Sequence, residues 1–211
     1  MLTKFFLLLL CISSAATSFS QIFTVVKEDA TLRQKITAAS KATKTIQSDF
    51  VQEKNLSMLA EKLISKGNFS FRQVNQVRLE YTHPFRYLMV ISNGKVTIKE
   101  ENKTTQVDMH KNKLFQQINN VIVDCVQGNA LANPNFKTQL SESNTQIKLD
   151  MKPIGKGLKD FFSSIVVVLD KKDFSVARMT MNEPSGDNTI ITFKNKQLNG
   201  TLANNLFMVA K

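Results

Sequence analysis

The stretch that decides the fold is KGNFSFRQVNQVRLEYTHPFRYLMVISNG, which runs from Lys66 to Gly94. Apolar or aromatic residues occupy alternate positions in three consecutive runs of it, at Phe69, Phe71, Val77, Leu79, Tyr81, Tyr87, Met89 and Ile91. Alternation of this kind places the apolar side chains on one face of a β-strand. The pairs His83-Pro84 and Asn93-Gly94 interrupt the runs, and an Asn-Gly pair is a strong hairpin signal. The stretch therefore predicts antiparallel strands that share one apolar face.

The same alternation extends in both directions along the chain. It predicts about eleven strands, over residues 46–54, 61–72, 77–82, 86–92, 95–101, 104–109, 135–140, 145–152, 163–169, 174–182 and 188–195. Helical spacing of apolar residues predicts an amphipathic helix over 29–45 and a broader one over 113–127, and the segment 153–162 interrupts the strands. A sheet of this size twists and curls, so its apolar face encloses a volume that side chains, helices or a bound guest must fill.

The first twenty residues have the pattern of a secretory signal peptide. A short basic start is followed by an apolar run and by small polar residues, with Ser18 and Ser20 placed for cleavage before Gln21. Cleavage after Ala16 is the second choice. Lipidation of Cys11 is disfavoured because Leu10, the residue before it, is not small. We expect a signal peptide over residues 1–20 and one exported domain over 21–211.

The composition narrows the possible functions. The formal net charge of the full chain is +11, yet its basic residues are scattered without a dense run, and export argues against a nucleic-acid partner. His83 and His110 are not spaced as metal ligands, and no nucleophile motif is present. We therefore expect no enzyme activity, no cofactor and no metal site. Cys125 lies in the apolar stripe of the 113–127 helix and is expected to be buried.

The order of several short motifs resembles the outer-membrane lipoprotein carrier family, LolA. The similarity rests on Asp49-Phe-Val-Gln52, Gly67-Asn-Phe69-x-Phe71, Leu79-x-Tyr81-x-x-Pro84, Ser92-Asn-Gly94, Val166-Val-Val-Leu169, Val176-Ala-Arg-Met179, Gly186-Asp-Asn-Thr-Ile190, Phe193-Lys-Asn195 and Asn205-Leu-Phe207. The resemblance implies a mainly β (α+β) fold: a single, strongly curved antiparallel sheet that forms a half-closed barrel, with two or three helices covering its concave apolar face.

The resemblance also implies a function. A LolA-like protein is a periplasmic chaperone that holds the acyl chains of lipoproteins and transports them from the inner to the outer membrane. Its expected partners are acylated lipoproteins, an inner-membrane ABC transporter that releases them and an outer-membrane receptor, and we expect a monomer. The candidate residues for binding acyl chains are apolar or aromatic: Phe50, Phe69, Phe71, Val77, Leu79, Tyr81, Met89, Ile91, Phe115, Ile118, Leu158 and Phe162.

The chain departs from the family at one motif. An arginine-proline pair that is common in the family, whose arginine holds the lid closed, is replaced here by Gln73-Val74. Arg72 and Gln73 are therefore the candidates for coupling the lid to the cargo. Two other functions stay open on the same scaffold, namely a sensor of lipids or lipoproteins and a carrier of a different lipid, because a fold does not determine a function.

Overall fold

The computed structural model describes residues 22–27, 30–59, 61–73, 75–101, 103–111, 116, 120–121, 123–125 and 129–209. The signal peptide expected over residues 1–20, including Cys11, lies outside the described residues. So do Phe115 and Ile118. The expected helix over 113–127 is described only in part, and residues 120–121 and 123–125 are helical.

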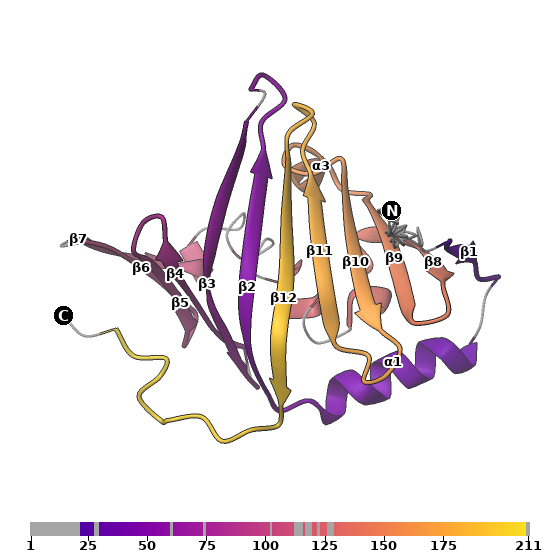
Figure 1. Ribbon diagram of the computed structural model, residues 1–211, viewed down its shortest axis with the longest axis horizontal. Helices are drawn as coiled ribbons and strands as arrows, with labels where there is room; N and C mark the ends of the chain where they lie inside the picture. Colours follow the sequence, from indigo (N-terminus) through magenta and orange to yellow (C-terminus); the bar gives the residue numbers. More distant parts are fainter. Residues whose placement is uncertain are drawn as a thin grey trace, which may run out of the picture.

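One antiparallel sheet of twelve strands forms the framework (Figure 1). Its strands, in chain order, are β1 (Thr24–Val25), β2 (Thr45–Asn55), β3 (Lys62–Arg72), β4 (Gln76–His83), β5 (Tyr87–Ser92), β6 (Lys95–Glu100), β7 (Lys103–Asp108), β8 (Phe136–Glu142), β9 (Gln146–Pro153), β10 (Ser164–Asp170), β11 (Val176–Asn182) and β12 (Asn188–Leu198). Besides the partly described helical segment at residues 120–125, the helices are α1 (Ala30–Ala42) and α3 (Lys156–Lys159), with 3-10 turns η1 (Met109–Lys111) and η2 (Asn129–Ala132). The predicted mainly β fold is confirmed.

The strand order is β1-β8-β9-β10-β11-β12-β2-β3-β4-β5-β6-β7. Two meanders, β2–β7 and β8–β12, thus meet where β12 pairs with β2. The sheet is open, because β1 and β7 lie at its two ends and do not pair with each other among the described strands. The predicted strands agree with the observed ones to within about three residues at each end, whereas the two-residue strand β1 was missed.

Helix α1 runs beneath the lower ends of β9–β11 (Figure 1). It is shorter than predicted, because the chain leaves it after Ala42 and enters β2 at Thr45. Its buried residues are Leu32, Ile36 and Ser40, whose four-residue spacing places them on one face of the helix. Ile46, just beyond the helix, is a buried residue of β2.

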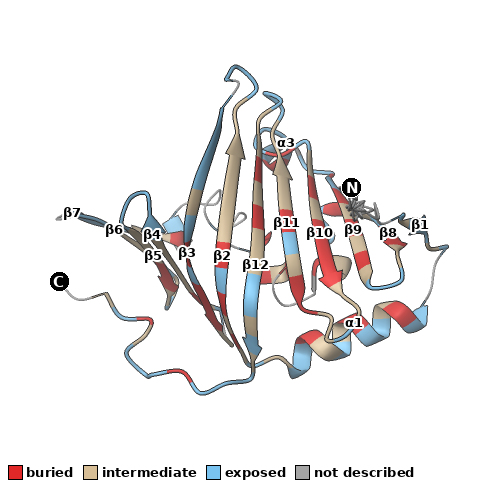
Figure 2. Cartoon of the chain, viewed as in Figure 1, coloured by how far each residue is buried: buried red, intermediate tan, exposed pale blue. Residues whose placement is uncertain are grey.

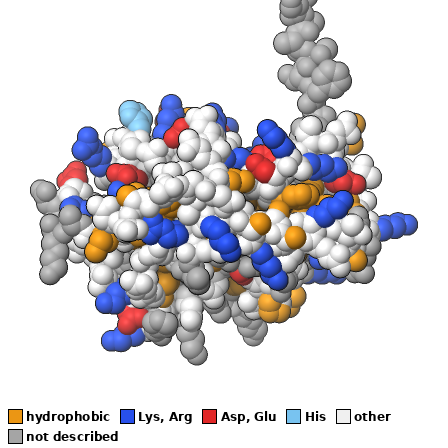
Figure 3. All heavy atoms as spheres, turned by 90° about the horizontal axis from the view of Figure 1, so that it is seen from below, with side chains coloured by type: hydrophobic (Ala, Val, Ile, Leu, Met, Phe, Trp, Pro, Cys, Tyr) orange, Lys and Arg blue, Asp and Glu red, His pale blue; other side chains and the backbone are white. Residues whose placement is uncertain are grey.

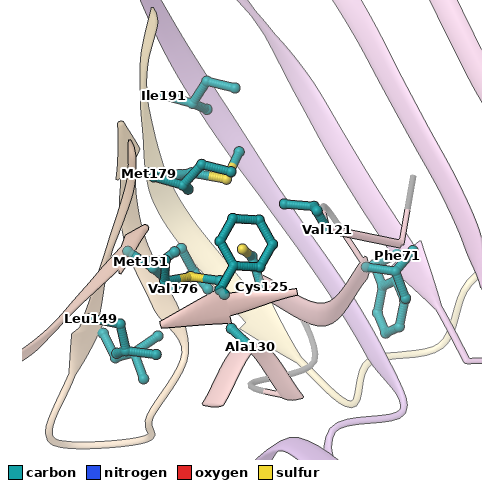
Figure 4. Close-up of a cluster of buried hydrophobic side chains, with 14 of the residues drawn as sticks. Phe71, Val121, Cys125, Ala130, Leu149, Met151, Val176, Met179 and Ile191 are labelled. Carbon is teal, nitrogen blue, oxygen red and sulfur yellow. The ribbon is translucent and has the colours of Figure 1, made fainter. Parts of the chain in front are cut away.

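The two meanders share one hydrophobic core. Figure 4 shows Val121, Cys125 and Ala130 among the side chains of β9, β11 and β12, with Phe71 of β3 close by. Cys125 is only 1% exposed, as expected, and burial raises the pKa of its thiol to about 12, with a further contribution from the nearby Asp124 carboxylate. A thiol in this environment is un-ionised at neutral pH and behaves as a small apolar side chain.

Candidate functional site

The inner face of β2–β5 changes from buried to open along the strands. Neighbouring strands align Phe71 with Val77 and Ile91 in one row, Phe69 with Leu79 and Met89 in the next. The first row is at most 3% exposed, and in the second only Phe69 is buried, while Leu79 and Met89 are partly exposed. Tyr81 and Tyr87, which pair in the row above, are partly exposed as well. Burial of the side chains on this face therefore decreases from the lower end of the strands, which is packed, to the upper end, which is accessible (Figure 2).

A cavity of about 680 Å³ opens at this upper end. It is lined by residues from β3, β4, the β4–β5 turn, β5 and the β6–β7 hairpin: Ser65, Tyr81, Pro84, Phe85, Arg86, Tyr87, Glu100, Glu101 and Lys103. Aromatic rings and a proline form its apolar part. The lower rows of the same face are packed with side chains. The cavity therefore begins where this packing ends, at the upper end of the face.

Aromatic contacts hold the floor of this cavity in place. The ring of Tyr81 packs edge-on against Phe50 with centroids 5.0 Å apart, and against Tyr87 at 5.4 Å. The Tyr81 hydroxyl donates a hydrogen bond to Oε1 of Gln52 at 2.8 Å. Burial, with a smaller effect of Tyr87, raises the pKa of Tyr81 to about 12. The floor is therefore uncharged at neutral pH, and the Tyr81 hydroxyl already has a hydrogen-bond partner.

The rim of the cavity is charged. Arg86 and Lys103 supply cations, Glu100 and Glu101 supply carboxylates, and none of the four has an ion pair with another described residue. Burial, and next the charge of Glu100, raise the pKa of Tyr87. An apolar floor beneath a charged rim suits a guest that has an apolar part and a polar head.

The sequence-predicted residues divide between the packed core and the open face. Phe50, Phe69, Phe71, Val77 and Ile91 are at most 4% exposed, and Leu158 and Phe162 are buried in and just after α3. Leu79, Tyr81 and Met89 are partly exposed, and of these Tyr81 lines the cavity.

Sequence reasoning missed several cavity residues. Tyr87 belongs to the alternating pattern and was not selected as a binding residue, although the pattern places it on the same face as Tyr81. Pro84 and Phe85 lie between two strands, where periodicity gives no signal. Phe85 is nonetheless 78% exposed, which is unusual for a phenylalanine.

The two lid-coupling candidates have different surroundings. Arg72 donates to the carbonyl oxygens of Leu202 and Ala203 at 3.0 and 2.9 Å, and its guanidinium lies 4.9 Å from the centre of the Phe207 ring. It thus fixes the C-terminal segment, where Phe207 and Leu202 are buried against Val90. The side chain of Arg72 therefore faces this segment, not the aromatic floor of the cavity.

Gln73, by contrast, contacts the chain at the end of α1. Its backbone N–H donates to the carbonyl of Lys44 at 2.9 Å, its Oε1 accepts from Nζ of Lys44 at 3.0 Å, and its Nε2 donates to the carbonyl of Lys41 at 3.4 Å. The β3–β4 turn is thereby connected to the C-terminal end of the helix.

Comparison with known proteins identifies the family. The family model described as outer membrane lipoprotein carrier protein LolA matches residues 41–210. The chain belongs to the LolA family. No individually curated protein sequence is significantly similar to this one.

Several solved structures share the LolA-like fold at low identity. MucB is 16% identical with a TM-score of 0.53, over 86% of this chain and 63% of MucB. An uncharacterised conserved protein from Thermus thermophilus is 11% identical with a TM-score of 0.51, over 84% of this chain and 93% of that protein. In the MucA/MucB complex from Pseudomonas aeruginosa the matched chain is 14% identical with a TM-score of 0.50, over 84% of this chain and 59% of that one. The chain thus spans less than two-thirds of the MucB structures, and these similarities concern the fold alone.

The described part of the chain lacks two features that concern membranes and metals. No helix in that part of the chain is both long and apolar enough to cross a bilayer. No group of three or more His, Cys, Asp or Glu side chains in it is arranged to hold a metal ion.

Figure 3 shows lysine and arginine side chains spread over the lower face of the molecule, without a single dense patch.

Proposed function

We propose that this protein is a periplasmic carrier that holds the acyl chains of lipoproteins on the inner face of its sheet and transfers them from the inner to the outer membrane. The observation that supports the proposal is the open cavity of about 680 Å³ over the aromatic floor of Tyr81 and Tyr87, in a chain of the LolA family. The partners that follow from this proposal are acylated lipoproteins, a releasing transporter in the inner membrane and a receptor in the outer membrane.

The physical basis of the proposal is the hydrophobic effect. Each buried methylene group contributes about 0.8 kcal/mol, so acyl chains do not leave a membrane for water unless a protein covers them. Partly exposed Leu79, Tyr81 and Met89 offer apolar surface next to the cavity. Since the lower rows are already filled, acyl chains would enter from the upper end, and deeper entry would need core side chains to move.

Opening of the lower end would involve α1. Gln73 has the contacts that coupling to this helix requires, because it binds Lys41 and Lys44 at the helix end. Arg72 is engaged by the C-terminal segment instead. We therefore assign lid coupling to Gln73 in preference to Arg72. A glutamine makes weaker hydrogen bonds than an arginine does, so this lid would open more readily than one held by the family arginine.

The proposal is tested by measuring the binding of a triacylated cysteine peptide to wild type and to Leu79→Glu. A carboxylate on the half-buried inner face would have to lose water when acyl chains cover it, so affinity should fall at least tenfold, which is about 1.4 kcal/mol. Thr104→Glu is the matched control, because it adds the same charge to an exposed position of β7. Phe71→Glu is unsuitable, since Phe71 is 1% exposed and a charge there would unfold the core.

Two outcomes would reject the proposal or change it. If Leu79→Glu keeps its melting temperature and binds the acylated peptide as wild type does, the acyl site is not on this face. Native mass spectrometry of the protein isolated from periplasm separates the remaining functions. A bound acylated polypeptide would support the carrier, whereas a free lipid would favour a carrier or sensor of that lipid.

A further inference from the structure

The upper part of β3 extends beyond its neighbour β4. Pairing of β3 with β2 continues up to Lys62, opposite Asn55, whereas pairing with β4 stops at Lys66, opposite His83. The register shifts between Lys66 and Gly67 at this point. Residues 62–65 therefore have a strand partner on one side only, among the described strands. Figure 1 shows the β2–β3 hairpin rising above the β4–β5 side of the sheet, and Figure 2 shows the upper part of β3 exposed.

The hydrogen-bond pattern shows which backbone groups face this free edge. The N–H of Gln73 donates to the carbonyl of Lys44 at 2.9 Å, and the β2–β3 register is continuous from there to the hairpin. In an antiparallel pair, alternate residues direct their N–H and C=O groups to the same neighbour. Leu63 and Ser65 therefore bond toward β2, whereas the backbone groups of Lys62 and Ile64 point toward the free edge.

The hairpin that presents this edge is held in place. Oδ1 of Asp187 accepts hydrogen bonds from N–H and Oγ of Ser57, at 2.7 and 2.8 Å, and Nδ2 of Asn55 donates to Asn188 at 2.7 Å. Hydrogen bonds and the β2–β12 ladder thus fix the hairpin against the β11–β12 turn. An edge that is both open and fixed needs no ordering before a strand can add to it.

The edge is apolar on both faces and adjoins the cavity. Leu63 is 55% exposed and Ile64 is 50% exposed, and they lie on opposite faces of β3. Ser65, the next residue, lines the cavity together with Tyr81 and Phe85. A chain that leaves the cavity at Ser65 would therefore meet unpaired backbone groups first, with apolar side chains on either side of them.

We propose that the free edge of β3 at residues 62–65 pairs with an extended segment of the cargo polypeptide, next to its acylated residue. This inference rests on the carrier function proposed above. Backbone pairing is independent of side-chain identity, which suits a carrier that accepts polypeptides of different sequence. Four residues span only about 13 Å and offer few hydrogen bonds. The edge is thus too short to retain a free peptide, but it can hold one whose acyl chains already occupy the cavity, because the tether raises the effective concentration.

The test compares Ile64→Pro with Ile64→Ala. Proline removes the N–H that points to the free edge and leaves the bonds to β2 intact, and proline is tolerated on an edge strand. Alanine removes more of the apolar side chain than proline does and keeps the N–H, so a loss seen only in the proline variant cannot come from lost apolar surface. Both are titrated with a triacylated cysteine that bears a short peptide and with the same acylated cysteine without the peptide.

We expect the peptide extension to strengthen binding about three- to tenfold in wild type and in Ile64→Ala, and to add nothing in Ile64→Pro, which corresponds to the loss of one or two backbone hydrogen bonds. Hydrogen exchange gives a second readout that needs no variant. The amides of Lys62 and Ile64 should become protected by the acylated peptide and stay unprotected with the acylated cysteine alone.

Each contrary result has its own meaning. If the acylated cysteine binds and the extension adds nothing in wild type, the edge is not the peptide site, although the carrier function stands. If neither probe binds, the carrier function itself fails. If the Ile64 amide is protected without cargo in a concentration-dependent dimer, a second copy of the chain occupies the edge and the inference is overturned.

Discussion

Gly67 lies at the point where β3 and β4 stop running in register. A Cβ atom at this position would lie 2.0 Å from the carbonyl oxygen of Glu80 and 2.8 Å from Cε1 of Phe50. The Phe50 side chain, opposite Gly67 on β2, occupies the space that a side chain at 67 would take. One residue thus lets the backbone of β4 approach closely and lets an aromatic ring of the core cover the strand.

Gly67→Ala should therefore destabilise the protein strongly. A backbone carbonyl cannot move away without breaking the β3–β4 pairing, so we expect a loss of about 3 kcal/mol or more in the free energy of unfolding, measured by denaturant titration. Gly155→Ala is the control, because a Cβ there meets nothing within 4 Å. Equal stabilities of the two variants would show that β4 shifts freely and that the close approach is not structural.

The β2–β3 hairpin illustrates how one carboxylate can fix an element. Hydrogen bonds from the N–H and the hydroxyl of Ser57 lower the pKa of Asp187 below its ordinary value of 3.8. Because the folded pKa is lowered, the stabilisation is present above the ordinary pKa and is lost as the pH falls through the lowered, folded value. The hairpin should therefore keep its position at neutral pH and release it only in acid.

Hydrogen exchange of the Ser57 amide measures this release. We expect its protection factor to be constant from neutral pH to about pH 4 and to fall below that, whereas in Asp187→Ala it should be low at every pH. The amide of Ser175, which donates to Asp173 at 2.9 Å in the β10–β11 turn, at the opposite end of β11 from Asp187, is the internal control and should not respond to the substitution. A pH-independent Ser57 amide in wild type would mean that other contacts hold the hairpin.

The strands show which features of the fold could be predicted from the sequence and which could not. Period-two alternation predicted eleven strands because most of them bury one face, and the described strands match the predicted ones. The pairing of β12 with β2 was not predictable in this way, since alternation reports burial and not the identity of the neighbour. β1 is too short for periodicity to register.

The candidate site was less predictable for a related reason. Alternation places Phe71 and Tyr81 on the same face, yet Phe71 is in the core and Tyr81 lines the cavity. Which positions are filled depends on α1 and on Val121, Val123 and Cys125, which come from elsewhere in the chain. The turn residue Phe85 lies outside any periodic segment, and the register shift between Lys66 and Gly67, next to the free edge of β3, is not revealed by sequence.

The whole molecule has a closely packed half and a more exposed half. In β9 and β10 the inward-facing Ile147, Leu149, Met151, Ile165 and Val167 are at most 1% exposed, and both strands are paired on both sides. In β7, at one end of the sheet, residues 103–106 are all exposed. Burial and two-sided pairing together determine the free energy of local opening, so the two halves should differ in stability.

This difference in packing predicts which strands change their amide exchange rates when cargo binds. Amides of β9 and β10 should exchange at least tenfold more slowly than those of β6 and β7 in the free protein, measured by hydrogen exchange under native conditions. An acylated cysteine should slow exchange in β4–β6, which adjoin the cavity, and leave β9 and β10 unchanged, because those strands are already closed. Uniform protection across the free sheet would mean that the two halves do not differ in stability. Cargo-induced protection confined to β9 and β10 would place the adaptable surface in the other half. The stable half would then be the binding half, and the cavity beside Tyr81 and Tyr87 would not be the place where acyl chains are held.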